Sequence, residues 1–177
     1  MDAWEVPISG FSDLLLAWIR DHAAWAPIVV WALAFCESLA FISLLVPATV
    51  ILIGAGGLIG AAGLSFWVNW LAAAVGAALG DWLSFWLARR YDYAITGLWP
   101  LSRHPGLLQR GEAFFRRWGV LGVFFGRFFG PLRATVPLAA GIAGMKPLPF
   151  QLANVTSALL WAAGILAPGA FGIQWLM

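Results

Sequence analysis

Apolar segments of membrane-spanning length dominate the pattern of hydrophobic and polar positions along this chain. Residues 66–88 form a largely apolar run of 23 residues, and roughly 20 are enough to cross a bilayer as a helix. Residues 148–176 form a second long run, in which Pro168 marks a position where a helix can kink. The pattern therefore predicts two transmembrane helices.

Two other apolar regions, residues 25–64 and 119–145, are interrupted by residues that break helices. The breaks are Pro47 in the first region, and Gly130-Pro131 followed by Pro137 in the second. Proline and glycine–proline pairs do not continue an ordinary helix. Because no polar loop separates the two halves of the first region, its turn is not expected to reach water. We expect each region to form a hairpin that turns inside the membrane.

The polar stretches divide a single membrane domain that covers residues 1–177. We expect an interfacial helix over residues 9–21 and a short amphipathic helix around residues 107–118. The parts of the domain are an interfacial segment (1–24), a first repeat (25–88), a polar loop (89–117) and a second repeat (118–177).

The order of hairpin and then span occurs twice, which predicts an internal repeat. The letters ATVIL at residues 48–52 return as ATVPL at residues 134–138, just after the break in each hairpin. A re-entrant hairpin returns to its own side, and one span follows it, so the second repeat must enter from the opposite face. We therefore expect an all-α fold of two inverted repeats with broken elements near the midplane, as in many secondary transporters.

Composition agrees with this class. Hydrophobic residues make up 62% of the chain and charged residues 10%, against about 25% charged in soluble domains. A net charge of +2, without a basic and aromatic surface, does not indicate a nucleic-acid partner. No metal-ligand spacing, nucleophile motif or cofactor loop is evident, so we expect no metal, no cofactor and no enzyme activity.

The distribution of basic residues predicts the orientation. Seven of the ten basic residues lie in residues 89–117 or at Lys146, whereas the N-terminal stretch is mainly acidic. By the positive-inside rule, the polar loop is cytoplasmic and the first hairpin enters from outside. The second hairpin then enters from the cytoplasm.

Four ionisable residues remain at membrane depth, namely Glu37, Asp81, Arg127 and Arg133. Two acids and two bases balance, which is one way in which a helix bundle keeps charges buried. One hypothesis is that these residues only pair with one another and hold the hairpins together. The other is functional, because ionisable residues inside a membrane are costly and usually have a task.

The functional hypothesis gives each residue a chemical role. Arg127 and Arg133 offer planar guanidinium groups suited to phosphate, and Gly130-Pro131 frees them from the separation of about 240° that an unbroken helix would impose. Glu37 can carry a proton or act as a charge partner. Asp81 can be a structural partner of an arginine or part of the pathway.

The sequence resembles the DedA family, also called the VTT or SNARE-associated group. The stretch GRFFGPLRATVPLAAGIAGM, from Gly126 to Met145, looks like its signature. Other landmarks follow in order: Glu37 ahead of Pro47, Gly80-Asp81, FFRRWG at residues 114–119, then Phe150, Asn154 and Trp161. The resemblance covers roughly residues 30–165.

The resemblance implies a multi-pass protein of the bacterial inner membrane that transports lipid. Some members are similar to carriers of undecaprenyl phosphate, relatives scramble phospholipids, and several are linked to the proton motive force. A membrane-embedded Glu and two signature arginines are required in the family, and they correspond here to Glu37, Arg127 and Arg133. The implied partners are a membrane lipid with a phosphate headgroup and protons, with the oligomeric state left open.

One departure from the family pattern concerns the energy source. Many members carry a second acid directly after the proline of the first hairpin, whereas this chain reads Pro47-Ala48-Thr49. Proton coupling is therefore left open for this chain. The expectation is a lipid transporter, with an energy-independent phospholipid scramblase and a non-transporting structural protein as the alternatives.

Overall fold

The computed structural model of this chain describes residues 21–39, 48–91, 105–129 and 132–176, and it is all-helical over these ranges. The elements are η1 (Ala23–Trp25), α2 (Ala26–Ser38), α3 (Ala48–Ala62), α4 (Phe66–Arg90), α6 (Pro105–Gly126), α7 (Leu132–Ile142) and α8 (Pro147–Leu176). The expected helical class is therefore confirmed. Pro47, Gly130, Pro131 and nearly all of the expected interfacial helix lie outside the described residues.

Two helices form the long axis of the molecule. α4 and α8 are both long and apolar enough to cross a membrane. Their bounds confirm the two long helices predicted over residues 66–88 and 148–176. α8 continues through Pro168 as one helix.

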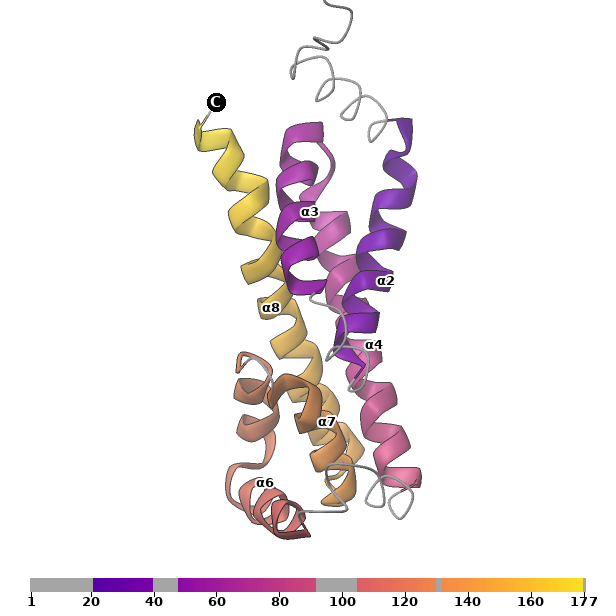
Figure 1. The fold of residues 1–177 in the computed structure, drawn as a ribbon, viewed down its shortest axis with the longest axis vertical. Helices are drawn as coiled ribbons and strands as arrows, with labels where there is room; N and C mark the ends of the chain where they lie inside the picture. The colour runs from indigo at the N-terminus through magenta and orange to yellow at the C-terminus, as the bar shows by residue number, and fades with distance from the viewer. Residues whose placement is uncertain (1–20, 40–47, 92–104, 130–131, 177) are drawn as a thin grey trace, which may run out of the picture.

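The shorter helices lie in opposite halves of the molecule. In Figure 1, α2 and α3 lie beside the upper part of the long helices, whereas α6 and α7 lie beside the lower part. α2 packs on α4 and α3 on α8, while α7 packs on α4 and α6 on α8. We call α2 with α3 the first short pair and α6 with α7 the second short pair. Each short pair therefore contacts both long helices.

The helices α6 and α7 differ from the sequence prediction at Pro137. α6 begins close to the expected amphipathic helix, and the chain then bends at Gly119, which has φ 47° and ψ −120°. The predicted break at Pro137 is wrong, because Pro137 lies inside α7. This proline is fully buried, so packing offsets a cost of about 3 kcal/mol for its lost hydrogen bond and ring clash.

Small residues let the helices approach closely. A side chain on Gly76 would overlap the carbonyl oxygen of Trp31, and a Cβ on Gly80 would lie 2.6 Å from that of Phe35. α3 and α8 approach in the same way, since a Cβ on Gly56 would lie 2.6 Å from the carbonyl oxygen of Leu166. Gly76 and Gly80 therefore give α4 a surface on which α2 can pack closely.

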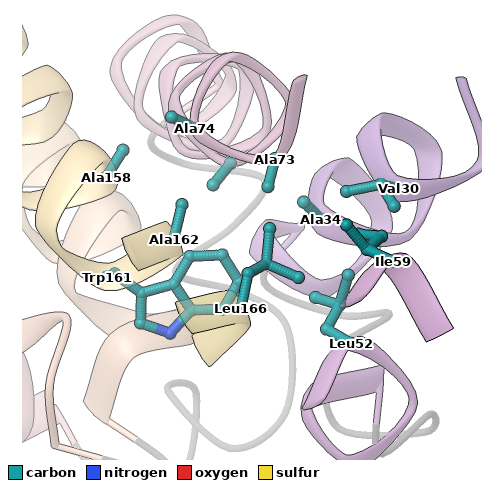
Figure 2. Packing of buried hydrophobic residues seen from close by; sticks show 11 residues of the cluster. Val30, Ala34, Leu52, Ile59, Ala73, Ala74, Ala158, Trp161, Ala162 and Leu166 are labelled. Atoms are coloured by element: carbon teal, nitrogen blue, oxygen red, sulfur yellow. The ribbon is translucent and has the colours of Figure 1, made fainter. Parts of the chain in front are cut away.

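Two apolar clusters fill the interior. One joins α2, α3, α4 and α8 and includes Leu52, Trp161 and Leu166 (Figure 2). The other joins α4, α6, α7 and α8, where the rings of Phe85 and Phe150 stack with centroids 4.1 Å apart. Along α4, the buried Asp81 lies between Ala77 of the first cluster and Phe85 of the second.

We predict that Gly76→Val destabilises the protein, because the added side chain collides with the backbone of α2. Overpacking of this kind costs about 1–3 kcal/mol. The measurement is the midpoint of thermal unfolding in detergent. Gly164→Ala is the matched control, because a Cβ there meets nothing within 4 Å and should leave the midpoint unchanged or raised. Equal effects at both positions would contradict the prediction.

Candidate functional site

The described ends of the short helices bring polar side chains into the interior of the molecule. Glu37 and Ser38 are the last residues of α2, and Thr49 lies in the first turn of α3. Arg127 directly follows α6, and Arg133 lies in the first turn of α7. Each of these side chains therefore lies within one turn of a helix end.

The first ion pair joins the end of α6 to the long helix α4, and a hydrogen bond from the same arginine reaches the long helix α8. Arg127 donates from Nη2 to Oδ2 of Asp81 on α4, and also to Oδ1 of Asn154 on α8 at 2.7 Å. Arg127 is 4% exposed and Asp81 7% exposed. A buried guanidinium that is shared by a carboxylate and an amide is held firmly between α4 and α8.

Asn154 extends this network into the backbone. Its Nδ2 donates to the carbonyl oxygen of Ala78 at 2.9 Å and to Oε1 of Gln151 at 2.8 Å. The Asn154 side chain is completely buried. The sequence marks Asn154 as a family landmark, and the structure shows that its side chain binds Arg127 and the backbone of α4.

The second ion pair joins α7 to α2, and so connects the second short pair of helices to the first. Arg133 on α7 donates from Nη1 to Oε1 of Glu37 at 2.7 Å and from Nη2 to Oγ of Ser38 at 3.2 Å. The side chain of Arg133 is 10% exposed, more than that of Arg127 at 3%. Its guanidinium carbon lies 4.3 Å from the ring centroid of Trp161 on α8.

Glu37 uses its two carboxylate oxygens differently. Oε1 accepts from both Arg133 and the hydroxyl of Thr49. Oε2 is buried, with no hydrogen-bond partner in the described part of the protein. Nη1 of Arg127 is likewise buried without a partner there. The site therefore holds one acceptor and one donor that the described protein groups do not satisfy.

The four predicted residues thus lie in one electrostatic cluster, but the two arginines bind different acids. Asp81 and Arg127 both act on Arg133 electrostatically, so the two ion pairs are close to each other. Within the described ranges, no three His, Cys, Asp or Glu side chains gather as metal ligands would. Three contributors carried no charge to mark them in the sequence, namely Ser38, Thr49 and Trp161.

Comparisons with known proteins identify similar membrane proteins. The VTT domain profile matches residues 46–171. The chain is 36% identical over 156 residues to the inner membrane protein YabI of Escherichia coli, covering 88% of this chain and 61% of that protein. It is 31% identical to the inner membrane protein YghB of Escherichia coli, covering 89% of this chain and 76% of that protein.

A third relative is an uncharacterized membrane protein of Buchnera aphidicola, 28% identical over 88% of this chain and 60% of its own length. The chain thus spans about 60% of the length of two of these relatives. No solved structure matches the chain. The names of these relatives place them in membranes and state no substrate.

We predict that Asp81→Asn destabilises the protein strongly, because it leaves the buried guanidinium of Arg127 without a counter-charge. Breaking a buried pair from one side typically costs about 3–5 kcal/mol. Thermal or denaturant unfolding in detergent measures the loss. The double variant Asp81→Asn with Arg127→Gln should recover much of it, because no unpaired charge is left. If the loss of stability in the double variant equals the sum of the losses in the two single variants, the prediction that Asp81 and Arg127 stabilise each other is contradicted.

Proposed function

The chain belongs to the VTT-domain, or DedA, family of membrane proteins, and on this premise we propose that it carries a phosphate-bearing lipid between membrane leaflets. The preferred lipid is undecaprenyl phosphate, and the membrane is a bacterial inner membrane that the chain crosses more than once. The work is binding and transfer, without covalent chemistry, and it uses no metal or cofactor.

The arrangement of the helices supports an inverted repeat with two re-entrant hairpins. Exchange of α2 with α6, α3 with α7 and α4 with α8 turns each packed pair into another observed pair: α2·α4 becomes α6·α8, and α3·α8 becomes α4·α7. The two short pairs also lie in opposite halves of the molecule (Figure 1). A two-fold relation of this kind lets one site between the repeats open to either side in turn.

One observation carries the functional proposal, namely the buried, unsatisfied Nη1 donor of Arg127 in a cluster of buried charges that also holds the guanidinium of Arg133. A buried donor without an acceptor costs about 1–3 kcal/mol, and more when it is charged. A phosphate oxygen would supply that acceptor, and guanidinium groups bind phosphate with strong, charge-assisted hydrogen bonds. The lipid tail can stay in hydrocarbon while its headgroup enters the site.

Glu37 then competes with the incoming phosphate. Arg133 can release Oε1 of Glu37 and turn the same N–H groups toward the anion. Glu37 is buried and would keep only the hydroxyl of Thr49 as a described partner. An ionised carboxylate in that position is costly, so a proton taken up by Glu37 would stabilise the loaded site. This exchange provides a route for proton coupling.

A second candidate is a structural protein that transports nothing. It is favoured by the Asp81–Arg127–Asn154 network, which ties the end of α6 to α4 and α8 without any ligand. On this alternative, arginine variants fail only by unfolding. Folded variants that lose transfer would exclude it.

We predict that Arg133→Ala and Arg127→Ala each abolish transfer of undecaprenyl phosphate in reconstituted vesicles, because the phosphate loses a guanidinium partner. The rate at which the lipid reaches the opposite leaflet is the measurement. Gel filtration and thermal unfolding must report the folded fraction for each variant.

Two variants sharpen this test. Arg117→Ala is the matched control, because Arg117 is an exposed arginine of α6 outside the site, and its loss should leave transfer near the wild-type rate. Glu37→Gln with Arg133→Gln removes the whole ion pair, so it should fold and still fail to transfer lipid. Wild-type transfer by this folded double variant would overturn the proposed site.

We predict further that an imposed pH gradient changes the rate of transfer, and that Glu37→Gln removes this response, because the amide cannot take up a proton. The same vesicle assay, with different internal and external buffers, is the measurement. A wild-type rate that ignores the gradient would instead indicate an energy-independent scramblase.

A further inference from the structure

We propose that Trp161 is a positioning residue of the anion site, which keeps the guanidinium of Arg133 in place while Glu37 and the phosphate exchange. This role rests on the proposed function of Arg133 as a phosphate ligand. It is carried by the stacking of Arg133 over the Trp161 ring, with 4.3 Å between the guanidinium carbon and the ring centroid.

The contacts of Arg133 fall into two geometric classes. The hydrogen bonds to Glu37 and Ser38 use N–H groups at the edge of the guanidinium plane. The Trp161 contact uses the face of that plane, where no N–H group points. A phosphate needs the edge, since it binds through the same N–H groups. Glu37 and Ser38 must therefore yield to the ligand, whereas Trp161 can stay.

Without a contact on its face, Arg133 would lose its described partners at the moment of exchange. A long side chain that is released from an ion pair regains rotamer freedom, which has to be lost again when the anion binds. Stacking on an indole ring avoids much of this cost, and tryptophan is the best aromatic partner for a cation. Trp161 thus pre-organises the guanidinium, which strengthens anion binding.

Trp161 is well suited to this task because it is itself fixed. It is 6% exposed and belongs to the apolar cluster that α8 forms with α2, α3 and α4. Figure 2 shows its ring among the side chains of this cluster, on the same helix as Ala162 and Leu166. Arg133 comes from α7, so the stack also links the two halves of the molecule. A ring on a long helix stays in place when a short helix shifts.

The experiment compares Trp161→Leu and Trp161→Phe with the wild type in full-length protein in detergent. Binding of farnesyl phosphate, a short prenyl phosphate, is measured by calorimetry, and transfer of undecaprenyl phosphate is measured in vesicles. We expect Trp161→Leu to raise the dissociation constant about 5- to 30-fold, the range of a partly to fully desolvated cation–π contact. Trp161→Phe should recover part of this loss, because it keeps an aromatic face. Transfer at saturating lipid should fall less than affinity.

Trp70→Leu is the matched control for a purely structural effect. Trp70 packs against the same apolar cluster, and its Nε1 donates to the carbonyl oxygen of Leu159 at 2.9 Å. Its loss should lower the unfolding midpoint without changing the dissociation constant of the folded protein. Equal dissociation constants for Trp161→Leu and the wild type would overturn the role of Trp161, as would a loss in Trp161→Leu that Trp70→Leu reproduces.

A further variant separates the failure of this inference from that of the proposed function. Arg133→Ala should abolish binding of farnesyl phosphate. If Arg133→Ala loses binding and Trp161→Leu keeps it, only the role of Trp161 is wrong. If Arg133→Ala binds as the wild type does, the phosphate site itself is wrong, and the positioning role falls with it.

Discussion

Four charges inside an apolar helix bundle can be tolerated only when each has a counter-charge, and this requirement organises the structure. The two ion pairs join residues 46 and 96 positions apart in the chain. One pair fixes the end of α6 between the two long helices. The other joins α2 to α7, and so connects the two short pairs. The helices also approach one another closely at glycines, and both ion pairs are largely buried, where the low polarity strengthens their attraction.

The two pairs are not equivalent, and their difference gives the molecule a fixed part and an exchangeable part. Arg127 is held by a carboxylate and by an amide that is itself anchored to the backbone of α4. Arg133 is held by a carboxylate oxygen that it shares with Thr49, and by a weaker contact with a hydroxyl. A ligand that competes for a guanidinium therefore displaces the partners of Arg133 more readily. The cost of separating that pair falls on Glu37, which is buried.

Sequence patterns predicted what depends on composition and length, and missed what depends on distant contacts. The lengths of the apolar runs predicted α4 and α8, and the lone charges at membrane depth pointed to Glu37, Asp81, Arg127 and Arg133. Which acid pairs with which arginine cannot be read from a pattern, because the partners come from separate helices. Asn154, Thr49 and Trp161 are ordinary residues of apolar helices until another segment packs on them. The helix break predicted at Pro137 was wrong for a related reason. The sequence shows the local cost of a proline in a helix, but not the packing of the buried ring that offsets this cost.

Thr49 shows how a neutral residue constrains the chemistry of the whole site. Its hydroxyl donates to Glu37 but carries no charge, so the quartet of two acids and two arginines is neutral by itself. An anion that enters this site adds negative charge to an environment that solvates charge poorly. One unit of that negative charge is offset if Glu37 takes up a proton, or if its carboxylate moves to where water can reach it. Among the described groups that face Arg133, Glu37 is the one that can do either without disturbing the anchored pair of Asp81 and Arg127. In the proposed mechanism, this single carboxylate is the group through which binding of a phosphate would be coupled to uptake of one proton.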